Sequence, residues 1–438
     1  MHLRRFLKTV ALDLGDRLMA SSPEPVQPFN VGSSTAPLAA ADWGALRQLF
    51  SLRQDQIQLA SYILSSHPVP VREAIEHYRQ RLDYDPVATV HEAFYRAEPA
   101  IRAAAARYLG GHPDQIALTD STTMGLAMVF SGLTLQPGDE VLHTSHDHYA
   151  MMTAIEHRAA RTGAQVRQVS LYDMPTTVSV GECVARLKAA VTAATRVVAV
   201  TWVHSSTGVK LPIRALADLI DEINRRRSSE EHILLCVDGV HGLGVEDFDV
   251  TELGCDFFIA GTHKWLFGPR GTGLIWGSTR GWERCKPVIP SFSRSGDVWR
   301  GSRTLIEVPV GEHMTPGGFH SFEHRWALPQ AFTLHLQLGK TNVQNRIHKL
   351  NTLAKEGLAD MHNVNLHTPM SPELSSGLVC FEVRGLKAHR VVKRMHREGV
   401  VIDQTPYRQS YARLGPSLLN NEKEIVTALE AISRLAGS

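Results

Sequence analysis

The stretch DFFIAGTHKWLFGPRGTG, residues 256–273, decides the fold class of this chain. Its apolar run at 257–260 has the pattern of a buried strand and leads through a short polar turn into Lys264. A lysine is strongly hydrated and rarely fully buried unless it is paired, yet this one stands between the strand and an apolar cluster at 265–267. Either its stem reaches out to solvent, or its amine serves a chemistry that needs an apolar setting.

Strands and helices alternate in the sequence before this stretch, from about residue 112. Continuous apolar strands separated by amphipathic helices are typical of a mostly parallel sheet with helices on both faces. We therefore predict an α/β fold in which ligand chemistry gathers at the carboxyl ends of the strands. The predicted strands are 115–119, 140–144, 164–171, 196–203, 232–239 and 257–261, and the predicted helices between them are 122–133, 149–162, 181–193 and 212–227.

The rest of the chain divides into further parts. After about residue 328 a long helical pattern precedes strands at 377–383 and 400–403 with a helix between them, which indicates a smaller α/β domain. Helical patterns also run from Trp43 to about Leu82. The predicted parts are an N-terminal arm and linker (1–38), a helical segment that packs on the small domain (39–85), a large domain (86–328) and a small C-terminal domain (329–438).

Composition and charge favour small-molecule chemistry. The chain has 438 residues, and its 46 basic and 44 acidic side chains give a net charge of +2. This balance gives no electrostatic reason to expect nucleic acid or a membrane surface as a partner, and no apolar segment is long enough to span a bilayer. The five cysteines form no CxxC pair and no metal-ligand spacing, so we predict no metal and a reduced, cytoplasmic environment.

The segment LRRFLKTVALDLGDRLMA, residues 3–20, resembles a twin-arginine export signal in its arginine pair. Asp13, Asp16 and Arg17 interrupt the apolar region that such a signal requires. We therefore interpret the segment as an amphipathic helix or arm of a cytoplasmic chain.

Asp238 and Lys264, at two predicted strand ends, together indicate a cofactor. Taken alone, Asp238 could form a turn before Gly239, and Lys264 could extend to solvent. A poorly hydrated amine, however, has a depressed pKa and forms an imine with a carbonyl. A carboxylate that keeps a pyridine nitrogen protonated makes the ring an electron sink. The two residues together therefore favour pyridoxal phosphate.

A phosphate site is predicted where the sequence LTDSTTMGLAMVF, residues 118–130, passes from strand to helix at about Thr122. Hydroxyls and free amides at a helix N-terminus hold a phosphate, although the same cluster could serve only as a helix cap. His263 could donate to this phosphate or be an ordinary polar loop residue.

The run VDGVHGLGVEDFDVTELGCDFFIAGTHKWLFGPRGTGLIWG, residues 237–277, resembles the class V aminotransferase family in its D-G-x-H, H-K-W and G-P-x-G-x-G elements. This family comprises fold-type I pyridoxal phosphate enzymes and includes cysteine desulfurases and isopenicillin N epimerase-like proteins. The resemblance extends from about residue 60 to 430. It implies a two-domain subunit and a homodimer whose active sites lie near the subunit interface.

The resemblance implies a role for each matching residue. Lys264 looks like the lysine that forms the imine with the cofactor, and Asp238 looks like the partner of its pyridinium. His241 occupies the place of a residue that contacts the cofactor's phenolic oxygen. The expected phosphate ligands are Thr122, Thr123 and His263.

Further roles concern the ring and the substrate. In the family an aromatic residue stacks on the pyridine ring; His148 matches it, and Tyr149 takes this place if the alignment shifts by one. Trp202 is expected to shape the substrate pocket, with His204 as the nearer polar candidate.

The segment YARLGPSLLNNEKEI, residues 411–425, resembles a substrate-binding segment of the family. Arg413 then looks like the guanidinium that binds the substrate α-carboxylate in a bidentate manner, and Arg408 is a second candidate.

Two departures from the family pattern bear on the reaction. The sequence GVVIDQTPYRQSYAR, residues 399–413, contains no cysteine where a desulfurase needs a nucleophilic one, so a persulfide route is not expected. The turn through which a partner subunit contacts the phosphate is replaced by residues 315–327, where Gly317 and Gly318 could offer backbone amides instead.

The expected function is that of a pyridoxal phosphate enzyme acting through an external aldimine at the α-carbon of an amino acid or amino-acid-bearing metabolite. Aminotransferase or lyase chemistry in specialised metabolism is expected first. An epimerase, a C–S β-lyase and an O₂-dependent decarboxylative deaminase are alternatives on the same scaffold. A non-catalytic binding protein is the alternative of another class, and it would be expected to lack Lys264 or Asp238.

Overall fold

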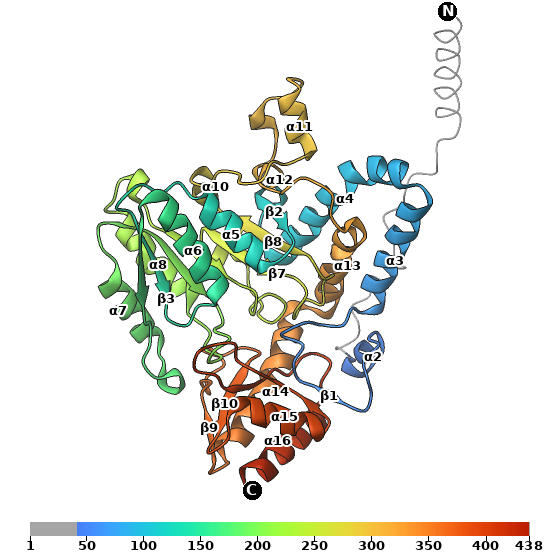
Figure 1. Cartoon of the computed structure of the whole chain (residues 1–438), viewed down its shortest axis with the longest axis vertical. Coiled ribbons are helices and arrows are strands. Elements are labelled where there is room, and N and C mark those ends of the chain that lie inside the picture. The colour runs from blue at the N-terminus through green and yellow to red at the C-terminus, as the bar shows by residue number, and fades with distance from the viewer. Residues whose placement is uncertain (1–41, 438) are drawn as a thin grey trace, which may run out of the picture. The chain divides into compact units, whose positions relative to one another are not determined.

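The computed structural model describes residues 42–437, and the predicted arm and linker at 1–38 lie outside them. A seven-stranded sheet forms the centre of the described part (Figure 1). Its order is β2-β8-β7-β6-β5-β3-β4, and every neighbouring pair is parallel except those that involve β8. The strands are β2 (Ile116–Thr119), β3 (Glu140–Thr144), β4 (Gln165–Val169), β5 (Thr195–Thr201), β6 (Leu234–Asp238), β7 (Phe257–Gly261) and β8 (Gly273–Gly277).

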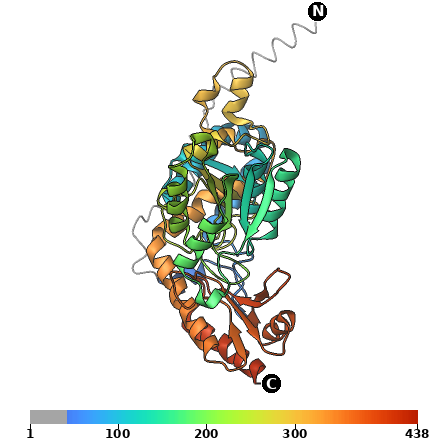
Figure 2. The same ribbon diagram turned by 90° about the vertical axis from the view of Figure 1, so that its left-hand side faces the viewer.

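Helices cover both faces of this sheet (Figures 1 and 2). Successive residues of a strand point to opposite faces: Leu235 and Val237 join one core, whereas Leu234 and Cys236 join the other. The first core includes side chains of α7 (Val180–Ala190) and α8 (Ile213–Asn224), and the second includes those of α5 (Thr122–Gly132) and α6 (Tyr149–Thr162). The continuous apolar runs of the sequence arise because both faces are buried.

The α/β fold predicted from the sequence is confirmed, and all six predicted strands are present. β8 was not among them, because its apolar run Leu274–Trp276 is short and has glycines on both sides. Gly273 at its start faces the backbone of Ala260 on β7, and a Cβ there would lie 3.1 Å from the Ala260 carbonyl oxygen. Glycine therefore permits close pairing of the two strands.

The segment before the large sheet is less helical than its pattern indicated. Helix α2 (Trp43–Gln48) is followed by irregular chain and by the short strand β1 (Ile57–Gln58), before α3 (Val69–Tyr84) and α4 (Pro86–Leu109) begin. β1 pairs in parallel with β11 (Val400–Val401), so the chain near residue 57 joins a late strand. The predicted helical pattern over 43–82 is thus wrong for the stretch between α2 and α3.

A second sheet of four antiparallel strands lies in the C-terminal part, in the order β12-β13-β10-β9. Its strands are β9 (Val364–Leu366), β10 (Val379–Val383), β12 (Asp403–Gln404) and β13 (Ala412–Leu414). The helices of this part are α14 (Lys340–Ala359), α15 (Ala388–Arg397) and α16 (Glu422–Ala436), whereas α13 (Phe322–Leu338) before them packs against α3 and α4. The predicted domain boundaries themselves stay predictions.

Short helical elements lie before, between and after the strands of the large sheet. They are α9 (Val250–Leu253), α10 (Thr279–Glu283), α11 (Ser293–Trp299) and α12 (Val310–His313). Four 3-10 turns complete them, η1 (Pro113–Gln115), η2 (Pro175–Thr177), η3 (Ser229–Glu231) and η4 (Leu305–Glu307). None of the helices that the structure describes is both long and apolar enough to cross a membrane.

Candidate active site

A pocket of about 340 Å³ lies at the carboxyl edge of the large sheet. β6 delivers Asp238 there, the turn after β7 delivers Lys264, and the N-termini of α5 and α6 follow β2 and β3 to the same edge. Carboxyl ends of parallel strands converge at one edge, which is why residues far apart in sequence meet here. The predicted residues that line the pocket are Thr122, Thr123, His148, Asp238, His241, His263, Lys264 and Arg413.

Lys264 lies in surroundings that shift the pKa of its amine. Its side chain is partly accessible because it lines an open pocket, but protein surrounds it on the other sides. Burial lowers the pKa of its amine to about 8, the Asp238 carboxylate opposes this shift, and the charge of Arg413 adds to it. A lysine with such a pKa has an appreciable neutral fraction near pH 8, which imine formation requires.

The backbone of Lys264 is fixed by a segment from the other end of the chain. The Ser65 hydroxyl donates to the Lys264 carbonyl at 2.6 Å, and the Ser65 N–H donates to the His263 carbonyl at 3.0 Å. Phe267, three residues after the lysine, has φ of 58° and is buried. A bulky residue in the left-handed region is strained and persists only when packing holds it, so this turn is set by its surroundings.

His241 presents a defined nitrogen to Lys264. The indole N–H of Trp265 donates to His241 Nδ1 at 3.3 Å, and His241 Nε2 lies 3.3 Å from Lys264 Nζ. Burial lowers the pKa of His241 well below its usual value, with nearby positive charges acting in the same direction, so the ring is neutral. An indole can only donate; the single ring proton therefore resides on Nε2 and points toward the lysine.

Asp238 is a buried carboxylate that receives few hydrogen bonds to offset the loss of water. Its Oδ1 accepts one hydrogen bond, from the Val240 N–H at 3.1 Å. Burial raises its pKa to about 6; the Val240 hydrogen bond and Lys264 lower it, and the charge of Asp147 raises it further. A carboxylate in such a place favours a cationic ligand atom beside it.

Asp147 is a second buried carboxylate at the same edge, and the sequence interpretation did not single it out. Its two oxygens accept hydrogen bonds from the N–H groups of Thr144 at 2.5 Å and Thr201 at 2.7 Å. It thereby joins the ends of β3 and β5. Burial raises its pKa to about 6, against these hydrogen bonds.

The N-terminus of α5 forms one end of the pocket. The Ser121 hydroxyl caps the helix by accepting from the Met124 N–H at 3.1 Å, and Thr122 Oγ1 accepts from the Gly261 N–H at 2.8 Å. The first N–H groups of a helix lack intrahelical acceptors, so those of Thr122 and Thr123 are suited to an anion such as a phosphate. His263 lines the same region, and burial lowers its pKa to about 4.

His148 and Tyr149 are placed differently. His148 is the N-cap of α6 and lines the pocket, and its Nδ1 accepts from the Ala150 N–H at 3.3 Å. The Tyr149 side chain is 64% exposed and is not part of the pocket lining. The geometry thus favours His148 as the ring that faces the cofactor.

Arg413 is a buried cation that lacks a carboxylate partner among the described residues. It is 5% exposed, its Nη1 donates to the Ser205 carbonyl at 3.1 Å, and its Nε makes no hydrogen bond within the described part. The guanidinium lies 4.4 Å from the centre of the Tyr62 ring, and the Tyr62 hydroxyl donates to the Arg413 carbonyl at 2.6 Å. Leaving a buried charge unpaired is costly, so this arrangement indicates an anionic ligand.

Three predicted substrate residues do not line the pocket. Trp202 packs against Phe248 and Phe258 in the core. His204 is buried, and its Nδ1 is 2.8 Å from the Tyr172 hydroxyl. Arg408 is exposed, in the loop before β13.

The predicted backbone donors lie in the 315–327 segment, whose start packs against β2. The Thr315 hydroxyl accepts from the Leu118 N–H at 3.0 Å. Gly317 packs against Phe292, and Gly318 has φ of 103° with open space where a Cβ would be. Neither glycine lines the pocket.

The structure adds pocket residues that sequence reasoning missed. They come from segments with no motif of their own, and only Ser121, within the predicted strand-to-helix turn, carried a local signal. The added lining residues with polar side chains are Tyr62, Ser121, Thr201, Ser205 and Asp403, and the apolar ones are Ile63, Leu126, Ala150, Val240 and Pro406.

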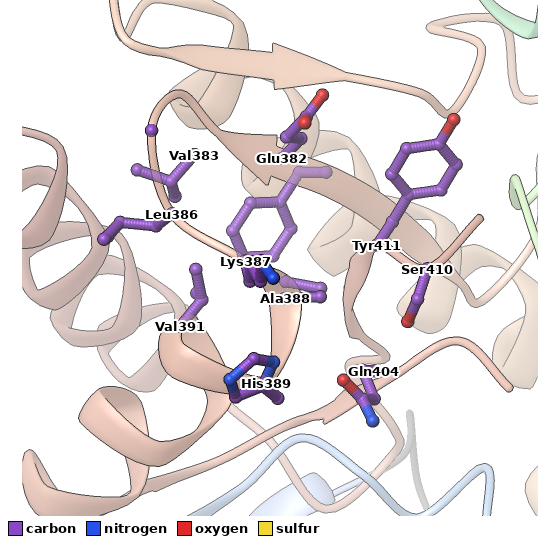
Figure 3. Close-up of a pocket in the computed structure, with 13 residues that line it drawn as sticks. Glu382, Val383, Leu386, Lys387, Ala388, His389, Val391, Gln404, Ser410 and Tyr411 are labelled. Carbon is purple, nitrogen blue, oxygen red and sulfur yellow. The ribbon is translucent and has the colours of Figure 1, made fainter. Parts of the chain in front are cut away.

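A larger pocket, of about 440 Å³, lies between β10, β13 and the start of α15 (Figure 3). None of the predicted site residues lines it. The Glu382 carboxylate in its wall lies 3.7 Å from His367 Nε2. Size therefore does not single out the candidate site, whereas Lys264, Asp238 and Arg413 all line the smaller pocket at the sheet edge. Within residues 42–437 no group of three or more His, Cys, Asp or Glu side chains is arranged to hold a metal ion.

A family profile described as Aminotransferase class-V matches residues 64–405, well over half of the chain. The chain belongs to the class V aminotransferase family. This family assignment confirms the resemblance that the sequence carried in the segment around Lys264.

Relatives of this class V chain are named for different activities. An isopenicillin N epimerase of Streptomyces clavuligerus is 27% identical over 413 residues, which cover 91% of this chain and 100% of that protein. A probable cysteine desulfurase of Halalkalibacterium halodurans is 24% identical over 357 residues, which cover 79% of this chain and 82% of that protein.

Solved structures confirm the fold of this class V chain. A mutant of C-DES with glycine covalently linked to its PLP cofactor superposes with a TM-score of 0.79 at 20% identity, over 88% of this chain and 98% of that one. A cysteine desulfurase from Thermococcus onnurineus gives a TM-score of 0.74 at 19% identity, and the match covers 90% of this chain and 98% of that one.

Pyridoxal 5′-phosphate is supported as the cofactor by the family assignment and by the PLP-bound neighbour. The donor set fits this group: a lysine of lowered pKa, a buried carboxylate and an open helix N-terminus line one pocket.

Proposed function

We propose that this chain is a pyridoxal phosphate-dependent enzyme that acts at the α-carbon of an amino acid or an amino-acid-bearing metabolite. One observation carries the proposal: a single pocket contains Lys264 with its pKa lowered to about 8 and Arg413 without a carboxylate partner in the described structure. The Lys264 amine can form an imine with a carbonyl and accept a proton from an acidic C–H bond, and the Arg413 guanidinium can bind a carboxylate.

The residues would divide the work as follows. When bound, pyridoxal phosphate supplies an electron sink that acidifies the α-carbon of an amino acid joined to it. Asp238 holds a proton at the ring nitrogen, because a buried carboxylate is stabilised by a cation beside it. The N-terminus of α5, with Thr122 and Thr123, binds the phosphate. His148 packs on the ring face.

Proton movement falls to Lys264. Its pKa of about 8 lets it accept a proton from the α-carbon and return it near neutral pH. His241 holds its Nε2–H toward this region and donates to the cofactor's phenolic oxygen, a role that its fixed tautomer suits. Arg413 orients the substrate by binding the α-carboxylate.

Covalent labelling tests the lysine assignment. Adding pyridoxal phosphate and then borohydride is expected to mark Lys264 in a peptide mass spectrum, and Lys264→Ala is expected to abolish the mark. Lys355 is an internal control, because burial also lowers its pKa to about 8 while its ammonium donates to the Pro369 and Met370 carbonyls outside the pocket. Labelling of Lys355 in place of Lys264 would refute the assignment, as would an absent visible band with the wild type.

Exchange at the α-carbon tests the chemistry whatever the final product is. In D₂O, the wild type with a substrate amino acid should lose the α-proton signal in the NMR spectrum. Loss of a general base typically costs about 10²- to 10⁴-fold, so Lys264→Ala should slow the exchange by that factor. A non-catalytic binding protein would show binding without any exchange.

The fate of the substrate after deprotonation separates the alternatives. We favour aminotransferase or lyase chemistry over a persulfide route, because the chain's five cysteines are all buried away from the pocket lining. Epimerisation is the second candidate, because isopenicillin N epimerases are among the relatives that span nearly the whole chain. Incubation under air and under nitrogen, with assays for keto acid, ammonia and the D-enantiomer, distinguishes transfer, elimination, oxidation and epimerisation.

The setting of the enzyme also belongs to this proposal. We expect a homodimer in the cytoplasm that serves specialised biosynthesis. The exposed apolar side chains Val288, Phe292, Trp299, Ile306 and Phe319 support self-association, since monomers rarely expose many large apolar groups in one region.

A further inference from the structure

Asp403 lies directly beside Arg413 in the second sheet. The two are register partners in the antiparallel pair β12–β13. Residues opposite each other in such a pair project their side chains to the same face. Both side chains line the same pocket, so a carboxylate and a guanidinium stand next to each other in its wall.

The two charges are nevertheless not paired. Within residues 42–437, no nitrogen of Arg413 lies within 4.0 Å of a carboxylate oxygen; its guanidinium contacts the Tyr62 ring and donates to the Ser205 carbonyl instead. Asp403 likewise has no hydrogen bond or ion pair from its side chain to any residue between 42 and 437. The pocket therefore offers two separate charges of opposite sign to a ligand.

Their positions differ along the depth of the pocket. Arg413 is 5% exposed, whereas Asp403 is only half-buried. The pocket lining also includes Pro406, an exposed residue three positions after Asp403, and Ile63, which is 44% exposed. The carboxylate of Asp403 thus stands toward the mouth, while Lys264 and Asp238 form the inner end.

We propose that Asp403 selects substrates whose side chain carries a positive charge, such as an amine, a guanidinium or an imidazolium. The proposal rests on the proposed function, in which Arg413 takes the α-carboxylate. A substrate held there places its distal group in the pocket beside Asp403. A cation at that point gains a charge-assisted hydrogen bond, whereas a second carboxylate meets a like charge and is disfavoured.

Binding of probes that cannot react with the cofactor tests this preference in the holoenzyme. Such probes have a carboxylate and no primary amine: γ-guanidinobutyrate is cationic at its distal end, pentanoate is neutral and glutarate is anionic. By calorimetry the wild type should bind γ-guanidinobutyrate about fivefold tighter than pentanoate, which is the scale of a partly exposed ion pair. Glutarate should bind more weakly than pentanoate.

Variants then assign the preference to Asp403. Asp403→Asn should remove the difference between γ-guanidinobutyrate and pentanoate, and Asp403→Lys should reverse the order so that glutarate binds best. Glu382→Gln is the matched control, because Glu382 lies on β10 of the same sheet and lines the other pocket (Figure 3). It should leave the order of the three probes unchanged.

The outcomes separate this inference from the proposed function. If the wild type favours pentanoate or glutarate, or if Asp403→Asn keeps the cationic preference, the role of Asp403 is wrong. If Arg413→Met leaves the binding of all three carboxylates unchanged, the proposed carboxylate site itself is wrong. As a second readout, lysine and arginine should change the cofactor absorbance at lower concentration than norleucine; Asp403→Asn should remove that advantage and Glu382→Gln should keep it.

Discussion

Replacing Asp238 by Asn is expected to stabilise the cofactor-free protein at neutral pH. The folded protein raises the pKa of this carboxyl from 3.8 to about 6, chiefly by burial. Each pKa unit corresponds to about 1.4 kcal/mol, so ionising Asp238 in the folded state costs about 3 kcal/mol. Asn has no such cost, and its side-chain oxygen can still accept the Val240 N–H.

The sign of the pH dependence follows from proton binding. Because the folded state holds the proton more tightly than the unfolded state, stability falls as pH rises from about 4 to about 6 and stays low above that range. The advantage of Asp238→Asn should therefore approach about 3 kcal/mol at pH 7.5 and vanish below pH 3.8. Urea unfolding of the cofactor-free variants at a series of pH values measures it.

Asp256→Asn is the matched control on the neighbouring part of the sheet. Asp256 is also buried, but its carboxylate accepts from Arg280 at 2.8 Å and 3.0 Å. Replacing it should destabilise the protein by about 1.5–3 kcal/mol, the scale of a hydrogen bond to a charged group. If Asp238→Asn destabilises the protein at pH 7.5, or if its gain is the same at pH 4 and pH 7.5, the reasoning is refuted.

Three further predictions concern the same molecule. Trp265→Phe removes the N–H that fixes the tautomer of His241, so His241 Nε2 no longer reliably donates to the cofactor's phenolic oxygen. Because that hydrogen bond stabilises the deprotonated cofactor, its loss should raise the pH midpoint of the cofactor absorbance by up to about one unit. An unchanged midpoint contradicts the tautomer assignment. In the cofactor-free protein, limited acetylation at pH 8 should mark Lys264 before the exposed Lys349, because burial lowers the pKa of Lys264 to about 8; equal rates in mass spectra would count against it. Trp299→Glu, at a side chain that is 87% exposed, should weaken self-association in light scattering, whereas an unchanged dimer mass would place the interface elsewhere.

Much of the large sheet was predictable because its signals are local. The apolar run that ends at Asp238 is buried on both faces, so it is continuous in the sequence and identifies a strand without any knowledge of its neighbours. β8 was missed because three glycines in GTGLIWG resemble a loop, and its antiparallel pairing with β7 gives no periodic signal of its own. Residues between α2 and α3 were misassigned because their packing depends on β11, more than 300 residues away in the chain.

The sequence by itself singled out the residues that we propose carry the chemistry. Asp238 ends a strand, and Lys264 and Thr122 each follow one. The carboxyl ends of parallel strands meet at one edge, so the assembly of these residues follows from local patterns and a general rule. Only the tertiary structure decided what completes the pocket. Tyr62 reaches Arg413 across 351 positions of the chain, and such contacts depend on how distant segments pack against one another, which no local periodicity records.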